Sequence, residues 1–345
     1  ILGIDIPEFR KRIVAAIVKN GRVRQSVFSP LLLPGVYGQL QESMFQFQPG
    51  FELMPRQIRS YPYNGAANIL GYIGEISPQM QLNPVYKDYN MGDYLGMTGL
   101  EKTYEQVLMG QRGIQYLVKD NLNRTQGAYE KGEFDTAAIA GKNLRLSLDI
   151  DLQVLGERLM HNKIGSIVAI DPQTGGILAM VSGPSFDPNL LTGSYRARNF
   201  SKLFSDTTKP LFNRAIQGTY APGSSMKPLM ALVALDEGII TPDFGYPCHG
   251  AYLSCGRRIA CEHAEAGHAA NLRLAISHSC NSYFVNLYRM AVDAKKWGGV
   301  EKGHQKWYEY MTSFGLGHRL GIDIPGEYAG YAIDTVGMNK RYRGL

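Results

Sequence analysis

One serine and one lysine, three residues apart, stand where a buried helix is expected to begin. Residues 220–228 read Tyr-Ala-Pro-Gly-Ser-Ser-Met-Lys-Pro, so Pro222 and Gly223 interrupt whatever precedes Ser224. The dense apolar residues 229–235 predict a buried helix immediately afterwards. Side chains three residues apart on a helix share a face, so the amine of Lys227 is expected to reach the hydroxyl of Ser224. The pair predicts a nucleophile and its base.

A lysine can take the proton of a serine hydroxyl only when its own pKa is lowered toward neutrality. Burial of Lys227 at the root of an apolar helix, near the positive end of the helix dipole, has this effect. The spacing alone is weak, because Ser-x-x-Lys occurs by chance about once in a chain with this many serines and lysines. The Pro-Gly break and the apolar helix after it give the motif its weight.

A second polar motif, Ser279-Cys280-Asn281, lies between two predicted helices at residues 272–277 and 283–291. Two polar side chains on such a turn can point into one cleft. Ser279 could then relay a proton between Lys227 and a leaving amine, and Asn281 could bind Lys227 and a substrate amide. The alternative is that Ser279 and Asn281 only cap a helix.

All four cysteines fall between Cys248 and Cys280, although the chain has 345 residues. In an oxidising compartment, such clustering favours a disulfide, for example between Cys248 and Cys261. Histidines 249, 263 and 268 lie in the same window, however, and mixed Cys and His ligands at loop spacings are typical of a tetrahedral zinc site. Both interpretations remain open at this point.

The residues before 143 mix short strand-like runs with a Gly-, Tyr-, Asn- and Gln-rich middle, which predicts an elongated, irregular, β-rich domain. Its clearest helix is expected at residues 99–109, where apolar side chains recur every fourth residue before Gly110. The polar residues 129–141 are a plausible crossing between domains.

A different pattern begins at Asn143. Residues 144–148 alternate like a strand, and a helix is expected from residue 150. Residues 167–170 and 177–181 predict two buried strands joined by a Pro- and Gly-containing turn. Because cores rarely grow beyond about 250 residues, we expect two domains, at residues 1–142 and 143–345, in an α+β chain.

Composition excludes several classes of protein. The formal charge is +6, but the basic residues are scattered and form no stripe interleaved with aromatics, which disfavours nucleic acid as a partner. No apolar run approaches the 18 or so residues that a membrane span needs. The sequence begins at Ile1 without a Met or a signal peptide, which suggests a trimmed chain.

Together these motifs resemble the penicillin-binding proteins, which carry Ser-x-x-Lys with Ser-x-Asn and Lys-Thr-Gly. The chain is most similar to class B members, and among them to the penicillin-binding protein 2 branch of the cell-elongation machinery. Residues 146–153 and 165–183 resemble the start of the family's transpeptidase domain. Segments at 59–63, 70–75 and 99–105 resemble its N-terminal pedestal, a dimerisation-type domain.

The resemblance implies a serine β-lactamase-like fold, with an antiparallel sheet flanked by helices, behind the pedestal. It implies that Ser224 is acylated, Lys227 is the general base, and Ser279 and Asn281 form the second motif. The implied reaction is peptidoglycan D,D-transpeptidation. Ser224 would attack the D-alanyl-D-alanine end of a stem peptide and expel D-alanine, and an amine of a neighbouring stem would resolve the acyl-enzyme. β-Lactams would acylate the same serine, and the N–H of Ser224 can supply one of two oxyanion donors.

For the cysteines, the resemblance favours Cys248, Cys261, His268 and Cys280 as ligands of a structural zinc. Cys255 would be left free, and His263 would be the substitute ligand. No cofactor is needed for catalysis, because a serine mechanism requires no metal.

The resemblance also implies a location and partners. Family members are held at the periplasmic face of the bacterial inner membrane by an N-terminal anchor, which would precede Ile1. A membrane glycosyltransferase and cell-shape proteins are the implied partners. The sequence contains no Lys-Thr-Gly, Lys-Ser-Gly or His-Thr-Gly, so we expect the third wall of the site to lie beyond Leu345.

Two other functions are compatible with the same motifs. One is hydrolysis, as in a β-lactamase or D,D-carboxypeptidase, although a large pedestal is unlike a β-lactamase. The other is a non-catalytic role, as a β-lactam sensor or a scaffold for morphogenesis proteins. Persistence of the acyl-enzyme and a cross-linking assay would distinguish them.

Overall fold

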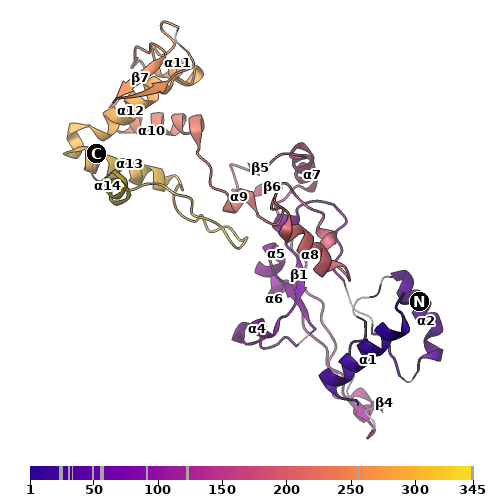
Figure 1. The fold of residues 1–345 in the computed structure, drawn as a ribbon. Helices are drawn as coiled ribbons and strands as arrows, with labels where there is room; N and C mark the ends of the chain where they lie inside the picture. The colour runs from indigo at the N-terminus through magenta and orange to yellow at the C-terminus, as the bar shows by residue number, and fades with distance from the viewer. Residues whose placement is uncertain are drawn as a thin grey trace. The chain divides into compact units, whose positions relative to one another are not determined.

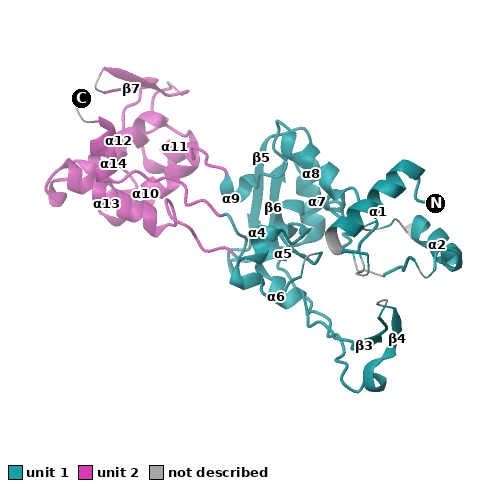
Figure 2. Cartoon of the chain, turned by 60° about the horizontal axis from the view of Figure 1, so that its bottom comes forward, with its two compact units in different colours: residues 1–217, 323–326 teal, residues 218–322, 327–345 magenta. Residues whose placement is uncertain are grey.

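A computed structural model describes residues 1–22, 26–29, 32, 34–48, 50–54, 58–90, 92–121, 124–254, 256–263 and 265–342 (Figure 1). The chain forms two compact units (Figure 2). Unit 1 contains residues 1–217 and 323–326, and unit 2 contains residues 218–322 and 327–345. The units divide at Gln217/Gly218, whereas the domain boundary predicted from the sequence, at 142/143, stays a prediction.

Unit 1 combines helices with short antiparallel strand pairs. Its α-helices are α1 (Ile6–Asn20), α2 (Pro34–Ser43), α3 (Ala67–Leu70), α4 (Pro78–Gln81), α5 (Gly99–Thr103), α6 (Glu105–Leu108), α7 (Ile150–Leu159), α8 (Arg196–Ser205) and α9 (Arg214–Gln217). Its strands are β1 (Ile73–Glu75), β2 (Tyr94–Gly96), β3 (Leu117–Lys119), β4 (Thr125–Ala128), β5 (Gly165–Ile170) and β6 (Ile177–Gly183). Short 3₁₀ turns cover Met44–Gln46, Pro84–Tyr86, Tyr129–Gly132 and Pro188–Leu191.

The hairpin predicted after residue 165 is confirmed. β5 and β6 pair antiparallel, with Ser166 opposite Ser182 and Val168 opposite Met180. β6 is largely buried, but β5 leaves Val168 and Ile170 exposed, so the expectation that both strands are buried is wrong for β5.

Helix α7 begins at Ile150 as predicted and packs against β6. Asp149 caps its first turn by accepting from the N–H groups of Asp151 and Leu152. The buried side chain of Gln153 bonds to both the N–H and the carbonyl of Met180. A buried amide must satisfy its donors and acceptors, so this pairing fixes the helix on the strand.

The three N-terminal segments that resemble the pedestal of the family meet in unit 1. Arg59 forms an ion pair with the buried carboxylate of Glu101, with Nε 2.7 Å from Oε1. Gly71 has a φ of 80°, and a Cβ there would lie 1.9 Å from the carbonyl oxygen of Thr98. Glycine is therefore required where these segments cross.

Two elements of unit 1 differ from the sequence prediction. The single helix expected at 99–109 is two short helices that break at Tyr104, whose φ of −104° and ψ of 19° are not helical. The carboxylate of Glu105, which begins α6, accepts from the N–H of Gly96 and the hydroxyl of Tyr89. Residues 144–148 alternate between half-buried and exposed, as predicted, but form no strand ladder. Ser147 instead donates its hydroxyl to the carbonyl of Ile177.

Unit 2 is mainly helical and contains both polar motifs that the sequence singled out. Its α-helices are α10 (Lys227–Asp236), α11 (Leu272–Ser277), α12 (Asn281–Val292), α13 (Val300–Ser313) and α14 (Thr335–Tyr342). One hairpin pairs β7 (Ala251–Ser254) with β8 (Arg257–Ala260), and 3₁₀ turns cover Gly223–Met226 and Lys295–Trp297.

The core of unit 2 lies between α10, α11 and α12. Ala231 and Ala234 of α10 are buried together with Tyr283, Phe284 and Leu287 of α12. Further along, His304 of α13 bonds to the hydroxyl of Tyr288 and the carbonyl of Ile333. Packing of α10 against α12 brings the two polar motifs together. Among the described residues, no helix is both long and apolar enough to span a membrane.

Candidate active site and metal centre

Ser224 lies in the 3₁₀ turn Gly223–Met226, which leads directly into α10. Gly223 has a φ of 58°, a value that favours glycine. Pro228 occupies the first turn of α10, where the missing N–H costs no hydrogen bond. The sequence prediction of a helix starting behind the Pro-Gly break is confirmed, and it leaves Ser224 exposed while Lys227 is buried.

The amine of Lys227 makes three hydrogen bonds to the second motif. Its Nζ lies 2.6 Å from the carbonyl oxygen of Ser279, 2.8 Å from Ser279 Oγ and 2.7 Å from Asn281 Oδ1. The side-chain amide of Asn281 donates in turn to the carbonyl of Ala260 at the end of β8. This bond leaves Asn281 Oδ1 directed at the lysine.

Contact between Ser224 and Lys227 runs through Ser279. The hydroxyl of Ser279 donates to Ser224 Oγ across 3.0 Å, while the same oxygen accepts from Lys227. The sequence predicted a direct contact between the amine of Lys227 and the hydroxyl of Ser224. The structure gives a three-membered chain of polar groups, because the buried lysine side chain turns toward the Ser279 turn.

The turn between α11 and α12 positions these groups. Ser279 adopts a φ of 48°, which is uncommon for a residue with a side chain. Cys280 is the N-cap of α12, and its Sγ accepts from the N–H of Tyr283. Capping is therefore done by Cys280, which leaves the side chains of Ser279 and Asn281 to bind Lys227.

The surroundings of Lys227 make it easier to deprotonate than an exposed lysine. Burial lowers the pKa of Lys227, although the nearby Cys261, Cys280 and Glu262 oppose this by stabilising the charged form. The ring of Phe284 lies 5.8 Å from Nζ and also favours the ammonium. Since the net direction is downward, the side chain is more readily available as a base than an exposed lysine.

Four buried side chains next to this motif form one cluster. The ligand atoms of Cys248, Cys261, His268 and Cys280 all lie within 4.8 Å of one another. Cys261 Sγ is 3.8 Å from Cys280 Sγ and 4.0 Å from His268 Nε2. Two thiolates bound to one zinc at about 2.3 Å would lie about 3.8 Å apart, so the donor set fits a tetrahedral metal.

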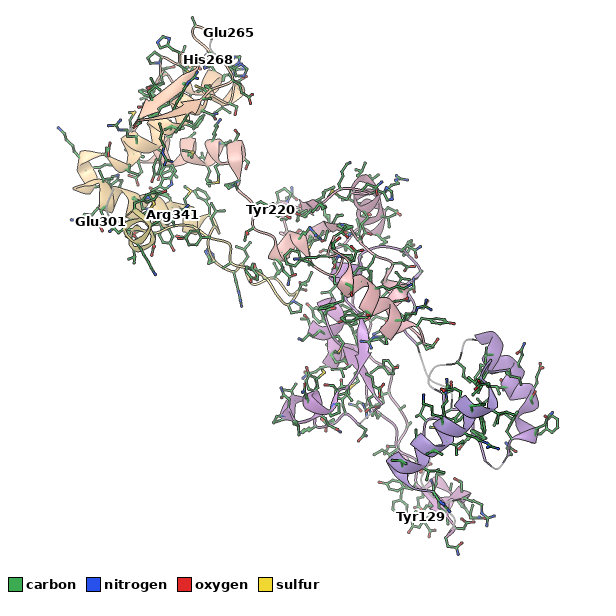
Figure 3. The ribbon with its side chains drawn as sticks, in the orientation of Figure 1. Tyr129, Tyr220, Glu265, His268, Glu301 and Arg341 are labelled. Atoms are coloured by element: carbon green, nitrogen blue, oxygen red, sulfur yellow. The ribbon has the colours of Figure 1, made fainter. Side chains whose placement is uncertain are left out.

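The other nitrogen of His268 supports this use of Nε2. His268 Nδ1 lies 2.6 Å from the carbonyl oxygen of Glu265, in the same loop (Figure 3). A ring N–H donated to a carbonyl fixes the tautomer that leaves Nε2 free for a metal. No sequence signal identifies a backbone carbonyl in this role.

The thiols have unequal acidities. Burial raises the pKa of Cys261, but hydrogen bonds from the N–H groups of His263 and Asn281 and from the thiol of Cys280 lower it to about 6. The pKa of Cys280 is raised, mainly by burial. One ready thiolate in the cluster suits metal binding.

Cys248, Cys261 and Cys280 are free thiols, so the disulfide between Cys248 and Cys261 is not formed. Cys255 lies outside the described residues. His263, the suggested substitute ligand, offers its carbonyl to Cys248 Sγ at 3.9 Å, while its ring contacts those of His268 and His278.

Comparison with known proteins identifies the family. The penicillin binding protein transpeptidase domain matches residues 165–340, more than half of the chain, and the penicillin-binding protein dimerisation domain matches residues 17–146. The chain therefore belongs to the penicillin-binding proteins, and the two domains together define class B.

Within this class, the chain is similar to penicillin-binding protein 2. It is 33% identical over 338 residues to the peptidoglycan D,D-transpeptidase MrdA of Acinetobacter baumannii, covering 94% of this chain and 46% of that protein. The chain thus spans about half the length of this relative.

Two solved structures share the fold. PBP2 of Pseudomonas aeruginosa in complex with WCK 5153 has a TM-score of 0.64 and 29% identity, covering 85% of this chain and 58% of that one. PBP2 of Helicobacter pylori in complex with MreC has a TM-score of 0.75 and 24% identity, covering 99% of this chain and 64% of that one. The predicted penicillin-binding fold with an N-terminal dimerisation domain is confirmed.

Proposed function

We propose that the protein is a peptidoglycan D,D-transpeptidase that forms cross-links through an acyl-enzyme on Ser224. The hydrogen-bonded chain from Ser224 through Ser279 to Lys227 carries the proposal, since it joins an exposed hydroxyl to a buried amine. Membership of the penicillin-binding proteins and similarity to MrdA support the reaction type.

Counting the hydrogens on Lys227 indicates how the hydrogen-bonded route from Ser224 through Ser279 to Lys227 would work. A neutral lysine has two N–H groups, which the carbonyl of Ser279 and Asn281 Oδ1 accept, and one lone pair, which is directed at Ser279 Oγ. Loss of the third lysine proton lets the hydroxyl hydrogens rotate, so that Ser279 donates to Lys227 and Ser224 donates to Ser279. As Ser224 Oγ attacks the carbonyl of the D-alanyl-D-alanine bond, its proton passes to Ser279 Oγ, and the proton of Ser279 passes to Lys227.

The same route runs backwards when the peptide bond breaks. The ammonium of Lys227 returns a proton through Ser279 to the departing amine of D-alanine, leaving the acyl-enzyme on Ser224. An amine of a second stem peptide then attacks the ester, gives up a proton through the chain and releases Ser224. The N–H of Ser224 is proposed as one oxyanion donor.

Cys248, Cys261, His268 and Cys280 are proposed as ligands of a structural zinc ion. Four protein ligands leave no open position, so the ion would stabilise the loop instead of taking part in the reaction. Because Cys280 separates Ser279 from Asn281, the centre would hold the second motif in place. Metal analysis with thiol counting tests this. One equivalent of zinc is expected, and zinc well below that, together with a disulfide linking Cys248 and Cys261, would rule the site out.

The proposed location is the periplasmic face of the inner membrane, with an N-terminal anchor outside these residues. A membrane glycosyltransferase and cell-shape proteins are proposed partners. The complex of Helicobacter pylori PBP2 with MreC supports the second class.

Labelling with a fluorescent penicillin tests the nucleophile. The full-length protein should be labelled covalently at Ser224, and Ser224→Ala should abolish the label. A long-lived acyl-enzyme distinguishes a transpeptidase from a β-lactamase, which clears it quickly. Cross-linking of lipid-linked substrate then distinguishes a transpeptidase from a carboxypeptidase or a non-catalytic binder, neither of which would form cross-links.

A further inference from the structure

Two buried thiols lie in contact directly beside the catalytic motif. Cys261 Sγ and Cys280 Sγ are 3.8 Å apart, and neither thiol is in a disulfide. The third thiol of the cluster, Cys248, lies within 4.8 Å of both. Its Sγ, however, is hydrogen-bonded to Ser282 Oγ at 3.1 Å. Cys261 and Cys280 are thus the pair best placed to react with each other.

Both members of the pair are attached to residues that hold the active site. Cys280 lies between Ser279 and Asn281, which bind Lys227. Cys261 follows Ala260, whose carbonyl accepts from Asn281. A covalent bond between the two sulfurs would therefore shift both the segment that contains Asn281 and the segment that accepts its hydrogen bond.

The size of this displacement can be estimated from bond lengths. Sulfurs in a disulfide are about 2.05 Å apart, so closing a 3.8 Å contact brings the two sulfurs closer by about 1.8 Å, and the side chains and backbone of both residues must adjust. A displacement of about 1 Å in positioned catalytic groups can cost about 100-fold in rate. The bond would disturb the contacts between Lys227, Ser279 and Ser224.

We propose that Cys261 and Cys280 are an oxidation site that shuts off the active site when the metal centre is empty. Cys261 is 8% exposed and Cys280 is 0% exposed, so a small oxidant such as hydrogen peroxide reaches Cys261 first. Cys261 is oxidised to a sulfenic acid with release of one water. The thiol of Cys280 then displaces a second water and forms the disulfide. In total, two thiols lose two electrons and two protons, and one peroxide becomes two waters.

A bound metal ion would prevent this reaction, because both sulfurs would be engaged as ligands. The proposal thus links metal status to activity, and oxidation would make loss of metal persist until the bond is reduced. Its effect on activity rests on the proposed role of Ser224, whereas formation of the bond does not.

The test uses the full-length protein with Cys255→Ser, which removes the thiol outside the described residues. Metal-depleted and zinc-loaded samples are treated with one equivalent of hydrogen peroxide and digested without reduction. Mass spectrometry should find peptides linked through Cys261 and Cys280 in the depleted sample only. Penicillin labelling of that sample should slow by about 100-fold and recover after treatment with dithiothreitol.

Cys261→Ser in the same background is the matched control, and its labelling rate should be the same before and after peroxide. Circular dichroism checks that depletion leaves the fold intact. If metal depletion unfolds the protein, the Cys248→Ser variant is used in place of the metal-depleted sample. This variant loses one proposed ligand and keeps both Cys261 and Cys280. A link through Cys248, no link at all, or a link with unchanged labelling would each overturn the proposal. Failure of the untreated protein to label at Ser224 would instead overturn the proposed function.

Discussion

The hydroxyl of Ser279 lies 3.0 Å from the hydroxyl of Ser224, although 55 residues separate them in the sequence. The same oxygen is 2.8 Å from the amine of Lys227. Ser279 therefore occupies the middle of the proposed proton route, and Ser224 in the 3₁₀ turn is connected to Lys227 at the start of α10 through Ser279.

We expect Ser279→Ala to slow acylation by about 100-fold or more, which is the usual contribution of a positioned proton-transfer group. The carbonyl of Ser279 and the amide of Asn281 would still hold Lys227, so folding should be preserved. Stopped-flow or gel-based labelling with fluorescent penicillin measures the rate.

Ser225→Ala is the matched control for this variant. Its hydroxyl binds the carbonyl of Pro222, next to the nucleophile but outside the proton route. Labelling of this variant should stay within about threefold of wild type, as expected for an exposed substitution. Equal losses in the two variants would remove Ser279 from the proton route.

Lys227→Arg should be nearly as damaging as Lys227→Ala. Arginine keeps its positive charge at any accessible pH, so it cannot accept the proton of Ser224. The acylation rate of both variants, measured with the same fluorescent penicillin, checks this. A near wild-type rate in the arginine variant would contradict the base role.

The sequence predicted the local structure around Ser224 better than it predicted the contacts between the two motifs. Pro222, Gly223 and the apolar run after them correctly indicated the helix behind Ser224. The route through Ser279 could not be predicted, because it depends on how α10 packs against α12 and on the left-handed backbone of Ser279. The spacing of residues in the sequence does not specify how two helices pack or which backbone conformation a turn adopts.

The same limit applies to the elements of unit 1. The apolar repeat at residues 99–109 indicated one helix, but the backbone leaves the helical conformation at Tyr104 and a second short helix begins at Glu105. Similarly, the capping alternative for Ser279 and Asn281 failed because Cys280 caps α12.

Gly71→Ala should strongly destabilise the protein. The added methyl would lie 1.9 Å from the carbonyl oxygen of Thr98, and the φ of 80° disfavours any side chain. We expect a loss of about 3 kcal/mol or more in the free energy of unfolding, measured by urea denaturation. Gly193→Ala is the control, because its φ is 68° but nothing lies within 4 Å of the added atom. That variant should lose only about 1 kcal/mol.

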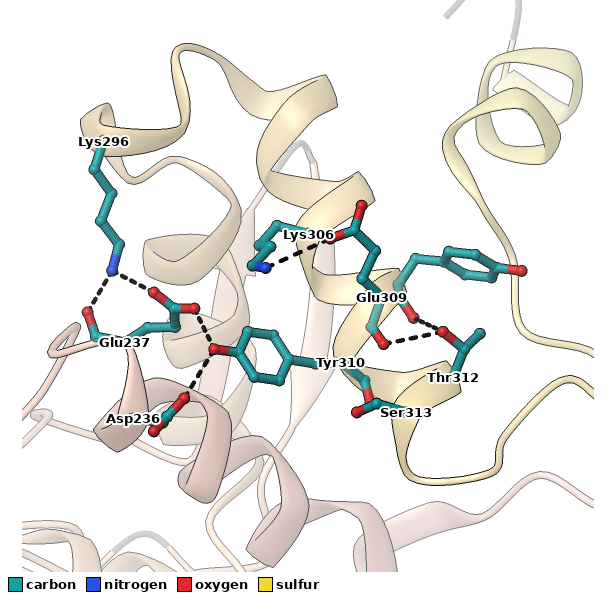
Figure 4. Close-up of polar contacts among 9 residues, drawn as sticks. Asp236, Glu237, Lys296, Lys306, Glu309, Tyr310, Thr312 and Ser313 are labelled. Atoms are coloured by element: carbon teal, nitrogen blue, oxygen red, sulfur yellow. Dashed lines mark hydrogen bonds and ion pairs between the residues drawn. The ribbon is translucent and has the colours of Figure 1, made fainter.

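A cluster of charged groups in unit 2 predicts a specific response to acid (Figure 4). Glu237 accepts from Lys296 Nζ at 2.6 Å and from the hydroxyl of Tyr310. Burial raises the pKa of Glu237, but these hydrogen bonds and the charges of Lys296 and Lys306 outweigh burial, so its pKa is lowered. The folded protein therefore binds fewer protons at this group than the unfolded chain does.

With this sign, Glu237 stabilises the fold fully above the unfolded pKa of about 4.3, and the contribution is lost as the pH falls through the lower folded pKa. Glu237→Gln should consequently be less stable than wild type at pH 7, and the difference should shrink below about pH 4. Urea unfolding at several pH values measures it. Glu309→Gln is the control, because Glu309 is 54% exposed and forms only an i,i+3 pair with Lys306, and it should change stability little at any pH. A deficit for Glu237→Gln that is constant from pH 7 to pH 3 would show that its carboxylate charge does not stabilise unit 2.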